Sequence, residues 1–255
     1  MTEMKLNRTL LRAIEILDLL SKNKEGYTLI EIVNELHAPK SSVFDILKTL
    51  VHTNMIEEDF TTGKSRYKVG LHTFLIGSNY VNGVDMVNVA KQYLVPLADK
   101  MKTTTFMAIL DDYMVTYLYK YESPESIITT ANIGSRRQLH SAALGKAMLA
   151  FSSQEVVDEA IQNIKFEPYT EYTITSIEKY LDVLKEVREK GYAKSDREDT
   201  LHQIAAAAPV FDHNGKVVAA ISCVGLYEES VDLDELGEIV RREANKISYT
   251  LGYCK

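Results

Sequence analysis

The sequence is poor in cysteine and has no long apolar segment, and each shortage excludes a class of protein. Cys223 and Cys254 are the two cysteines among 255 residues, too few for a disulfide framework. No apolar run approaches the roughly 20 residues that span a bilayer, and residues 1–8 lack the apolar segment of a signal peptide. We therefore expect a cytoplasmic protein that makes no use of a membrane.

Motifs of the common enzyme classes are missing as well. No stretch follows the nucleophile-elbow pattern of a hydrolase, and no glycine-rich loop fits a P-loop or a dinucleotide fingerprint. His140, His202 and Cys223 carry zinc-ligating atoms, although their spacing matches no compact metal signature. We expect no enzyme, no cofactor and no metal. A metal-responsive regulator that uses these three residues is the alternative.

Charge is divided unevenly along the chain, whose net charge is −7. Residues 1–75 carry ten basic and ten acidic side chains, which leaves 19 basic and 26 acidic side chains for the rest. The first third is therefore neutral and the remainder acidic. This division permits DNA binding by the N-terminal third, because a local basic patch matters more than the total charge.

Two helices are predicted near the N-terminus. Apolar residues at helical spacing over 10–20 indicate the first, and Thr9 is its expected N-cap. The second begins at Thr28, which forms a capping box with Glu31 ahead of an apolar stripe over 29–36.

A third helix follows a short break. Pro39 cannot continue the second helix and disfavours helical geometry at the residue before it. Ser41 or Ser42 is the expected N-cap, and the buried face consists of Val43, Ile46, Leu47, Leu50 and Val51. The apolar period then changes to two, which predicts a hairpin of residues 55–58 and 65–69 around a turn at 59–64. This order of elements is typical of a winged helix-turn-helix.

Polar side chains in this module form the candidate DNA contacts. A recognition helix presents polar residues at its N-terminal end and on one exposed face, where they reach base edges. The third helix offers Lys40, Ser41, Ser42, Asp45 and Lys48; contacts outside it are expected from Arg8, Arg12, Thr28, Lys64 and Arg66. Asp45 is unfavourable beside phosphate, although its carboxylate can accept a hydrogen bond from cytosine. The alternative is a sensor whose module binds proteins and does not read DNA.

The remaining residues predict an α+β domain with a largely antiparallel sheet. Strands are expected near 105–110, 114–121, 204–211 and 217–224, and helices near 144–150, 154–163, 177–190 and 233–252. Residues 213–216 form a hairpin turn of the type HNGK. A long helix over 84–101 is expected to connect the two domains.

Three stretches resemble the isocitrate-lyase-regulator (IclR) family of bacterial transcription factors. They are APKSSV at 38–43, continuing through the third helix and YKVG at 67–70; GSRRQLHSAALGKAMLA at 134–150; and GYAKSDREDT at 191–200, continuing through residues 205–225. The resemblance implies a winged helix-turn-helix over 1–75, a linker helix region over 76–102 and a GAF-like effector-binding domain over 103–255. It also implies a repressor that binds a double-stranded DNA operator as a homodimer or homotetramer.

The resemblance further implies an effector pocket for a carboxylic or sugar acid. The residues carried over position by position are Ala143, Leu144, Ser195, Asp196, Ala205, Ser222 and Val224, and His202 joins them as a proton-dependent donor. The chain departs from the family pattern at Ala142, where a polar residue is common, at Ala205, where cysteine is common, and at His202, where glycine is usual. A basic residue is frequent where Asp45 stands, and a second serine where Val224 stands. The N-terminus of the helix near Leu144 can itself hold an anion.

Overall fold

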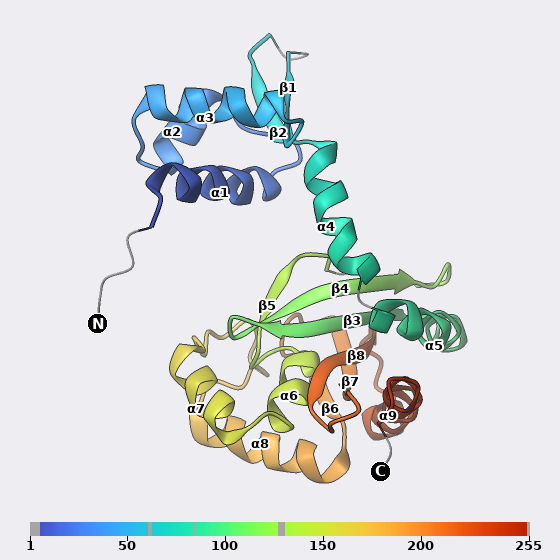
Figure 1. Ribbon diagram of the computed structural model, residues 1–255. Coiled ribbons are helices and arrows are strands. Elements are labelled where there is room, and N and C mark those ends of the chain that lie inside the picture. Colours follow the sequence, from blue (N-terminus) through green and yellow to red (C-terminus); the bar gives the residue numbers. More distant parts are fainter. Residues whose placement is uncertain (1–5, 61–62, 84, 127–130, 254–255) are drawn as a thin grey trace. The chain divides into compact units, whose positions relative to one another are not determined.

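The computed structural model describes residues 6–60, 63–83, 85–126 and 131–253 (Figure 1). The chain folds as two compact units, Met1–Gly83 and Val84–Lys255, and each is described by itself. Within the described residues, no helix is long and apolar enough to cross a membrane.

The first unit contains the predicted helices and hairpin in the predicted order. Its elements are α1 (Arg8–Ser21), α2 (Leu29–Glu35), α3 (Lys40–His52), β1 (Ile56–Asp59), β2 (Arg66–Val69) and α4 (Leu71–Gly83). The strands are antiparallel, with Ile56 opposite Val69. The three helices and the hairpin enclose one apolar core that includes Ile16, Leu20, Ile32, Leu47 and Ile56. The winged helix-turn-helix prediction is therefore confirmed.

Two of the predicted helix caps are wrong. Asn7, not Thr9, caps α1, because its side-chain oxygen accepts hydrogen bonds from the N–H groups of Thr9 (3.0 Å) and Leu10 (3.1 Å). Pro39 is the N-cap of α3 and makes no side-chain cap, so Ser41 and Ser42 lie inside the helix.

The capping box and the hairpin turn follow the sequence pattern more closely. The Glu31 carboxylate accepts from the Thr28 N–H at 2.7 Å, and the Thr28 hydroxyl accepts from the Glu31 N–H at 3.3 Å. In the hairpin turn, Gly63 has a φ of 74°, a conformation that favours glycine. Thr61 and Thr62 of the predicted turn lie outside the described residues.

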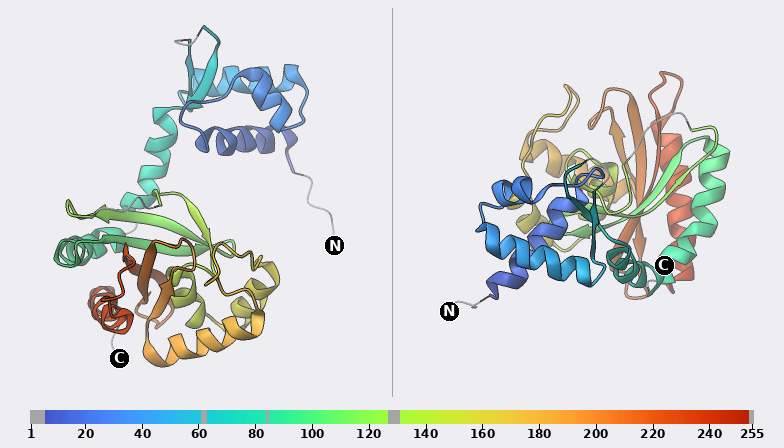
Figure 2. Two further views of the ribbon diagram at one scale, coloured as in Figure 1. Left: turned by 180° about the vertical axis from the view of Figure 1, so that it is seen from behind. Right: turned by 90° about the horizontal axis from the view of Figure 1, so that it is seen from above.

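The second unit is a six-stranded antiparallel sheet with helices on both faces. Its elements are α5 (Asp85–Met101), β3 (Thr104–Asp111), β4 (Met114–Glu122), β5 (Arg136–Gln138), α6 (Ala143–Ala150), α7 (Gln154–Asn163), α8 (Ile177–Lys190), β6 (Ala193–Asp196), β7 (Gln203–Phe211), β8 (Val217–Leu226) and α9 (Leu233–Thr250). The strand order is β5-β4-β3-β8-β7-β6. Helices α5 and α9 cover one face, and α6 covers the other with α7 and α8 packed against it (Figures 1 and 2). This arrangement confirms the α+β fold class.

The helix expected to act as a linker over 84–101 is part of this second unit. Val87, Ala90 and Leu94 of α5 are buried, and the Thr105 hydroxyl of β3 donates to the Leu94 carbonyl at 3.1 Å. The sequence prediction also missed α4, β5 and β6. Residue 84, the first of the predicted linker helix, lies outside the described residues.

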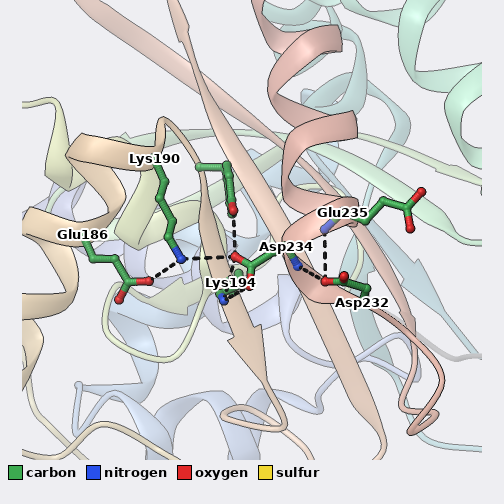
Figure 3. Close-up of polar contacts among 7 residues, drawn as sticks. Glu186, Lys190, Lys194, Asp232, Asp234 and Glu235 are labelled. Carbon is green, nitrogen blue, oxygen red and sulfur yellow. Dashed lines mark hydrogen bonds and ion pairs between the residues drawn. The ribbon is translucent and has the colours of Figure 1, made fainter.

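A surface network ties α8, β6 and α9 together (Figure 3). The Asp234 carboxylate, in the first turn of α9, accepts from the Tyr192 hydroxyl at 2.7 Å and from the amines of Lys194 (3.0 Å) and Lys190 (3.2 Å). These hydrogen bonds, first that of Tyr192, hold the pKa of Asp234 well below its usual range. The network fixes the edge of the sheet next to the start of α9.

Candidate DNA-binding surface and effector cavity

Helix α3 presents a polar face opposite its apolar one. Ser41, Asp45 and Lys48 are exposed at positions i, i+4 and i+7, and Lys40 is exposed at the helix start. Val43, Ile46, Leu47 and Leu50 on the other side are buried in the core. The Lys48 amine lies 4.4 Å from the centroid of the Phe44 ring, which positions this cation along the exposed face. The fold therefore leaves the polar side of the recognition helix free to approach a groove of DNA.

Some predicted contacts already have partners inside the unit. The Arg12 guanidinium donates to the Ser42 hydroxyl at 2.6 Å, which joins α1 to α3. The Thr28 side chain is occupied by the cap of α2.

Among the predicted DNA contacts, Arg66 has three partners within the unit. It donates to the backbone carbonyls of Glu25 (3.0 Å) and Gly26 (2.7 Å) and pairs with the Glu31 carboxylate at 3.4 Å. Its first role is to hold the wing against the loop before α2. Lys64 and Arg8 are exposed, one in the hairpin and the other in the first turn of α1.

A cavity of about 60 Å³ lies between the sheet of the second unit and the start of α6. Six of the eight residues expected in the effector pocket line it: Ala143, Leu144, Ser195, Ala205, Ser222 and Val224. They come from α6, β6, β7 and β8, which are up to 81 residues apart in the chain. The antiparallel pairing of Ser195 with Ala205 and of Ala205 with Val224 brings these strands together.

The deep end of the cavity contains polar groups that have no partner. The hydroxyls of Ser141 and Ser222 are buried and make no hydrogen bond to any described residue. Helix α6 starts here without a side-chain cap, and its first intrahelical bond runs from the Lys146 N–H to the Ala142 carbonyl at 3.2 Å. The N–H groups of Ala143 and Leu144 precede that bond. Buried donors without partners are costly, and a helix N-terminus favours negative charge, so the arrangement suits an anion.

One charged pair lies among the lining residues. Arg137 on β5 and Asp199 in the loop after β6 both line the cavity, and the Arg137 Nε lies 3.7 Å from the Asp199 Oδ2. Tyr117 lies beside them. Burial raises the pKa of Tyr117 to about 12, while Arg137 acts to lower it and Asp199 to raise it.

A buried ion pair joins α6 to the loop after β6. The Lys146 amine of α6 donates to the Glu198 Oε1 at 2.6 Å, and both residues are buried. Burial lowers the pKa of Lys146 and raises that of Glu198, each against the attraction of its partner. The Glu198 Oε2 has no partner among the described residues. This pair fixes the loop after β6 to the helix that begins at the cavity.

Two of the expected pocket residues, Asp196 and His202, do not line the cavity. The Asp196 carboxylate forms a bidentate pair with Arg197 (2.7 and 3.0 Å). The Arg197 guanidinium lies over the rings of Tyr172 and Tyr227, 4.2 and 3.8 Å from their centroids. His202 is exposed, and its carbonyl accepts from the Tyr227 N–H. Tyr117, Arg137, Ser141 and Asp199 also line the cavity and are not among the eight expected residues. Ser141 and Arg137 had a sequence signal, their closeness to the start of α6, whereas Tyr117 and Asp199 had none.

The structure does not bring together His140, His202 and Cys223, the three residues of the metal hypothesis. Ser222 and Val224 face the cavity, so Cys223 between them points to the other face of the sheet, where its sulfur lies 2.8 Å from the Thr103 hydroxyl. His140 is buried beside Phe166 and Tyr169. Over the described ranges, no group of three or more His, Cys, Asp or Glu side chains has the geometry to hold a metal ion.

A winged helix-turn-helix followed by an α+β unit with a cavity is the arrangement expected of a DNA-binding transcriptional regulator. The family model "Bacterial transcriptional regulator IclR C-terminal" matches residues 78–249, and the "IclR helix-turn-helix domain" matches residues 9–59. The chain belongs to the IclR family of bacterial transcriptional regulators. The alternative of a module that does not read DNA has no support from these matches.

Relatives and solved structures agree with this assignment. The regulator KdgR of Escherichia coli is 30% identical over 248 residues, which cover 96% of this chain and 93% of KdgR. The repressor AllR of Salmonella typhimurium is 28% identical over 243 residues, covering 94% of this chain and 89% of AllR. The crystal structure of an IclR homolog from Microbacterium hydrocarbonoxydans, complexed with 4-hydroxybenzoate, has a TM-score of 0.84 at 21% identity and covers 95% of this chain and 98% of that chain.

Proposed function

We propose that the chain is a repressor whose affinity for its operator is controlled by a small organic acid bound in the cavity of the second unit. The observation that carries the proposal is the pair of buried, unpartnered hydroxyls of Ser141 and Ser222 at the uncapped start of α6. Two hydroxyls and the free N–H groups of a helix N-terminus match the acceptor oxygens of a carboxylate. The complex of one solved homolog with 4-hydroxybenzoate, itself a carboxylic acid, supports this ligand class.

The DNA contacts we propose come mainly from the exposed side of α3. Lys40 and Lys48 supply positive charge, while Ser41 and Asp45 supply groups that can reach base edges. Arg8 and Lys64 are assigned to phosphate. Ser42 is assigned a positioning role through its hydrogen bond to Arg12, and Arg66 and Thr28 serve the wing and α2.

A homodimer or homotetramer is part of the proposal. Leu10 and Ile14 of α1 are 61% and 48% exposed, and Leu71 and Phe74 of α4 are 63% and 66% exposed. Apolar side chains gathered in this way mark interaction surfaces. Two recognition helices in one dimer read two half-sites, so the operator is expected to be a pseudo-palindrome.

Ligand binding acts on DNA affinity only through a difference in affinity for two arrangements of the chain. Couplings of about 1–3 kcal/mol are typical and correspond to roughly 5- to 150-fold changes in operator affinity. We assign the transmission to α5 and α4, which follow each other between the two units in the sequence.

The ligand side is tested by a thermal-shift screen of the full chain against pyruvate, gluconate and 4-hydroxybenzoate, each with its neutral amide. A bound acid at 100 times its Kd stabilises the fold by about 2.7 kcal/mol. Ser222→Ala should reduce the shift given by the best acid, and Ser152→Ala, a serine outside the cavity, should leave it unchanged. Equal thermal shifts in the two variants would show that the cavity does not bind the ligand.

The DNA side is tested with duplexes selected from a random pool by the full chain. Lys40→Ala and Lys48→Ala should each weaken binding and lower the slope of log K against log salt concentration by about 0.9, the value for one phosphate contact. Lys179→Ala, a cation on α8 of the second unit, is the control. Unchanged affinity in both α3 variants would exclude this helix from DNA recognition.

A further inference from the structure

We propose that Asp199 is a built-in counter-ion of Arg137 that an acidic effector displaces, so that Asp199 sets how strongly the cavity discriminates acids from neutral ligands. This inference rests on the proposed function, because it concerns the same cavity. It assigns a specificity role to a residue outside the eight expected ligand positions.

The charge balance of the cavity is the first observation. Of the described residues that line it, Arg137 and Asp199 are the ones that carry full charges, and they have opposite signs. Their closest charged atoms are 3.7 Å apart, within the range of an ion pair and beyond the length of a good hydrogen bond. The lining is therefore neutral as long as the pair persists, although the start of α6 favours an anion. An acid that enters meets one carboxylate already beside the cation.

The second observation is that the backbone around Asp199 is fastened on both sides. Before it, Glu198 is held by the buried bond to Lys146, and its carbonyl accepts from the Thr173 hydroxyl at 2.6 Å. Arg197 is held between two tyrosine rings, and its carbonyl accepts from the Thr170 hydroxyl at 2.6 Å. After it, the Gln203 N–H donates to the Thr200 carbonyl. The Asp199 carboxylate is therefore presented to the cavity by a fixed loop, and only its side chain needs to turn away.

Partial exposure of both side chains keeps the cost of separating the pair small. The side chains of Arg137 and Asp199 are 47% and 27% exposed, so both reach water at the cavity mouth. A carboxylate that turns from a guanidinium into water loses little free energy, because exposed ion pairs are weak. An effector carboxylate held at the same time by Arg137, the two serines and the start of α6 has more partners than Asp199 has. Displacement is thus favoured for an acid, whereas a neutral amide gains nothing from it.

The test compares Asp199→Asn with wild type by calorimetric titration of the full chain. The probes are pyruvate with pyruvamide, gluconate with gluconamide, and 4-hydroxybenzoate with 4-hydroxybenzamide. Asparagine keeps the size of the side chain and removes its charge. Asp182→Asn on exposed α8 changes the net charge equally and serves as the control. Arg137→Gln is the second variant, and thermal unfolding without ligand checks that each variant folds.

We expect Asp199→Asn to bind the acid about 2- to 5-fold more tightly than wild type, a change of roughly 0.4–1 kcal/mol, with the amide unchanged. Arg137→Gln should weaken binding of the acid and leave the affinity for the amide unchanged. Equal acid affinity in wild type and Asp199→Asn, or weaker binding in the variant, overturns the counter-ion role and leaves the proposed function standing. If none of the acids binds either protein, the proposed function fails, and the counter-ion role fails with it.

Discussion

Replacing Lys146 with methionine should destabilise the second unit by several kcal/mol, because the change removes one half of a buried ion pair. The Lys146 side chain is 1% exposed and the Glu198 side chain 11% exposed, so neither can turn to water. Methionine fills nearly the same volume as the lysine stem, which limits the packing loss. The main effect is that the Glu198 carboxylate, whose Oε2 already lacks a partner among the described residues, loses its cation as well.

The size of the effect follows from the two ways in which the pair can be altered. Removing one partner of a buried ion pair typically costs about 3–5 kcal/mol, since an uncompensated charge stays in the core. Replacing both partners with apolar residues is often neutral. The double variant Lys146→Met/Glu198→Leu should therefore be more stable than Lys146→Met alone, by about 2 kcal/mol or more.

The destabilisation should depend on pH in a defined direction. Burial raises the pKa of Glu198, and loss of Lys146 removes the largest opposing influence. The unfolded carboxyl ionises near pH 4.3, whereas the folded one stays protonated to a higher pH. The folded state then binds more protons, so stability is retained below about pH 4.3 and falls as pH rises towards the folded pKa, by up to about 1.4 kcal/mol per pH unit. Lys146→Met should be less destabilised at pH 5 than at pH 8.

Amide hydrogen exchange over residues 143–150, measured by mass spectrometry, reports the opening of α6 without mixing in the first unit. Unfolding of the whole chain would combine two units and need not be two-state. Faster exchange in Lys146→Met, partly reversed in the double variant and smaller at pH 5, is the expected result. A cost below about 1 kcal/mol, or a double variant no more stable than the single one, would refute the assignment of this contact as a buried ion pair.

Three further changes test the local structure. Gly145→Ala should destabilise the second unit by about 1–3 kcal/mol, because an added Cβ would lie 2.5 Å from the Leu139 carbonyl oxygen; faster amide exchange over residues 143–150 checks this. Asp234→Asn should cost about 1 kcal/mol at pH 7, as its side chain is 52% exposed. Its pKa is depressed, so that contribution is present above about pH 4 and is lost at lower pH, where variant and wild type should converge in acid unfolding. Arg66→Ala should destabilise the packing of the wing by about 1–3 kcal/mol, because it removes the hydrogen bonds to the backbone carbonyls of Glu25 and Gly26. Faster amide exchange over residues 66–69 would report this change.

Much of the fold could be predicted because local signals agree with it. Helices α7 and α8 have the predicted bounds, since Ser153 and Ser176 cap them and Gly191, with a φ of 80°, ends α8. The signals fail where they are short or ambiguous. Strand β5 has three residues, too few for a period of two to appear. The prediction of Thr9 as the cap of α1 is wrong because Asn7, two residues earlier, supplies the capping oxygen.

The candidate site could be predicted only where the family motifs extend. Ala143, Leu144 and Ser222 lie in recognisable stretches, so their positions could be carried over. The side chains of Arg137 and Asp199, 62 residues apart in the chain, lie 3.7 Å from each other although β5 and β6 are the two ends of the strand order. No local pattern encodes such a pairing. His202, by contrast, stood in a motif and is exposed.

The loop after β6 links three kinds of contact that act on the same cavity. Arg197 fastens it at the surface, Glu198 fastens it to α6 in the core, and Asp199 presents a carboxylate to the cavity between these anchors. A change at Glu198 therefore alters the position of Asp199 as well as the stability of the unit. The Lys146→Met variant should accordingly lose acid discrimination along with stability, whereas Asp199→Asn should change discrimination alone. Measuring both quantities in both variants separates the role of the loop as a support from its role as a selector.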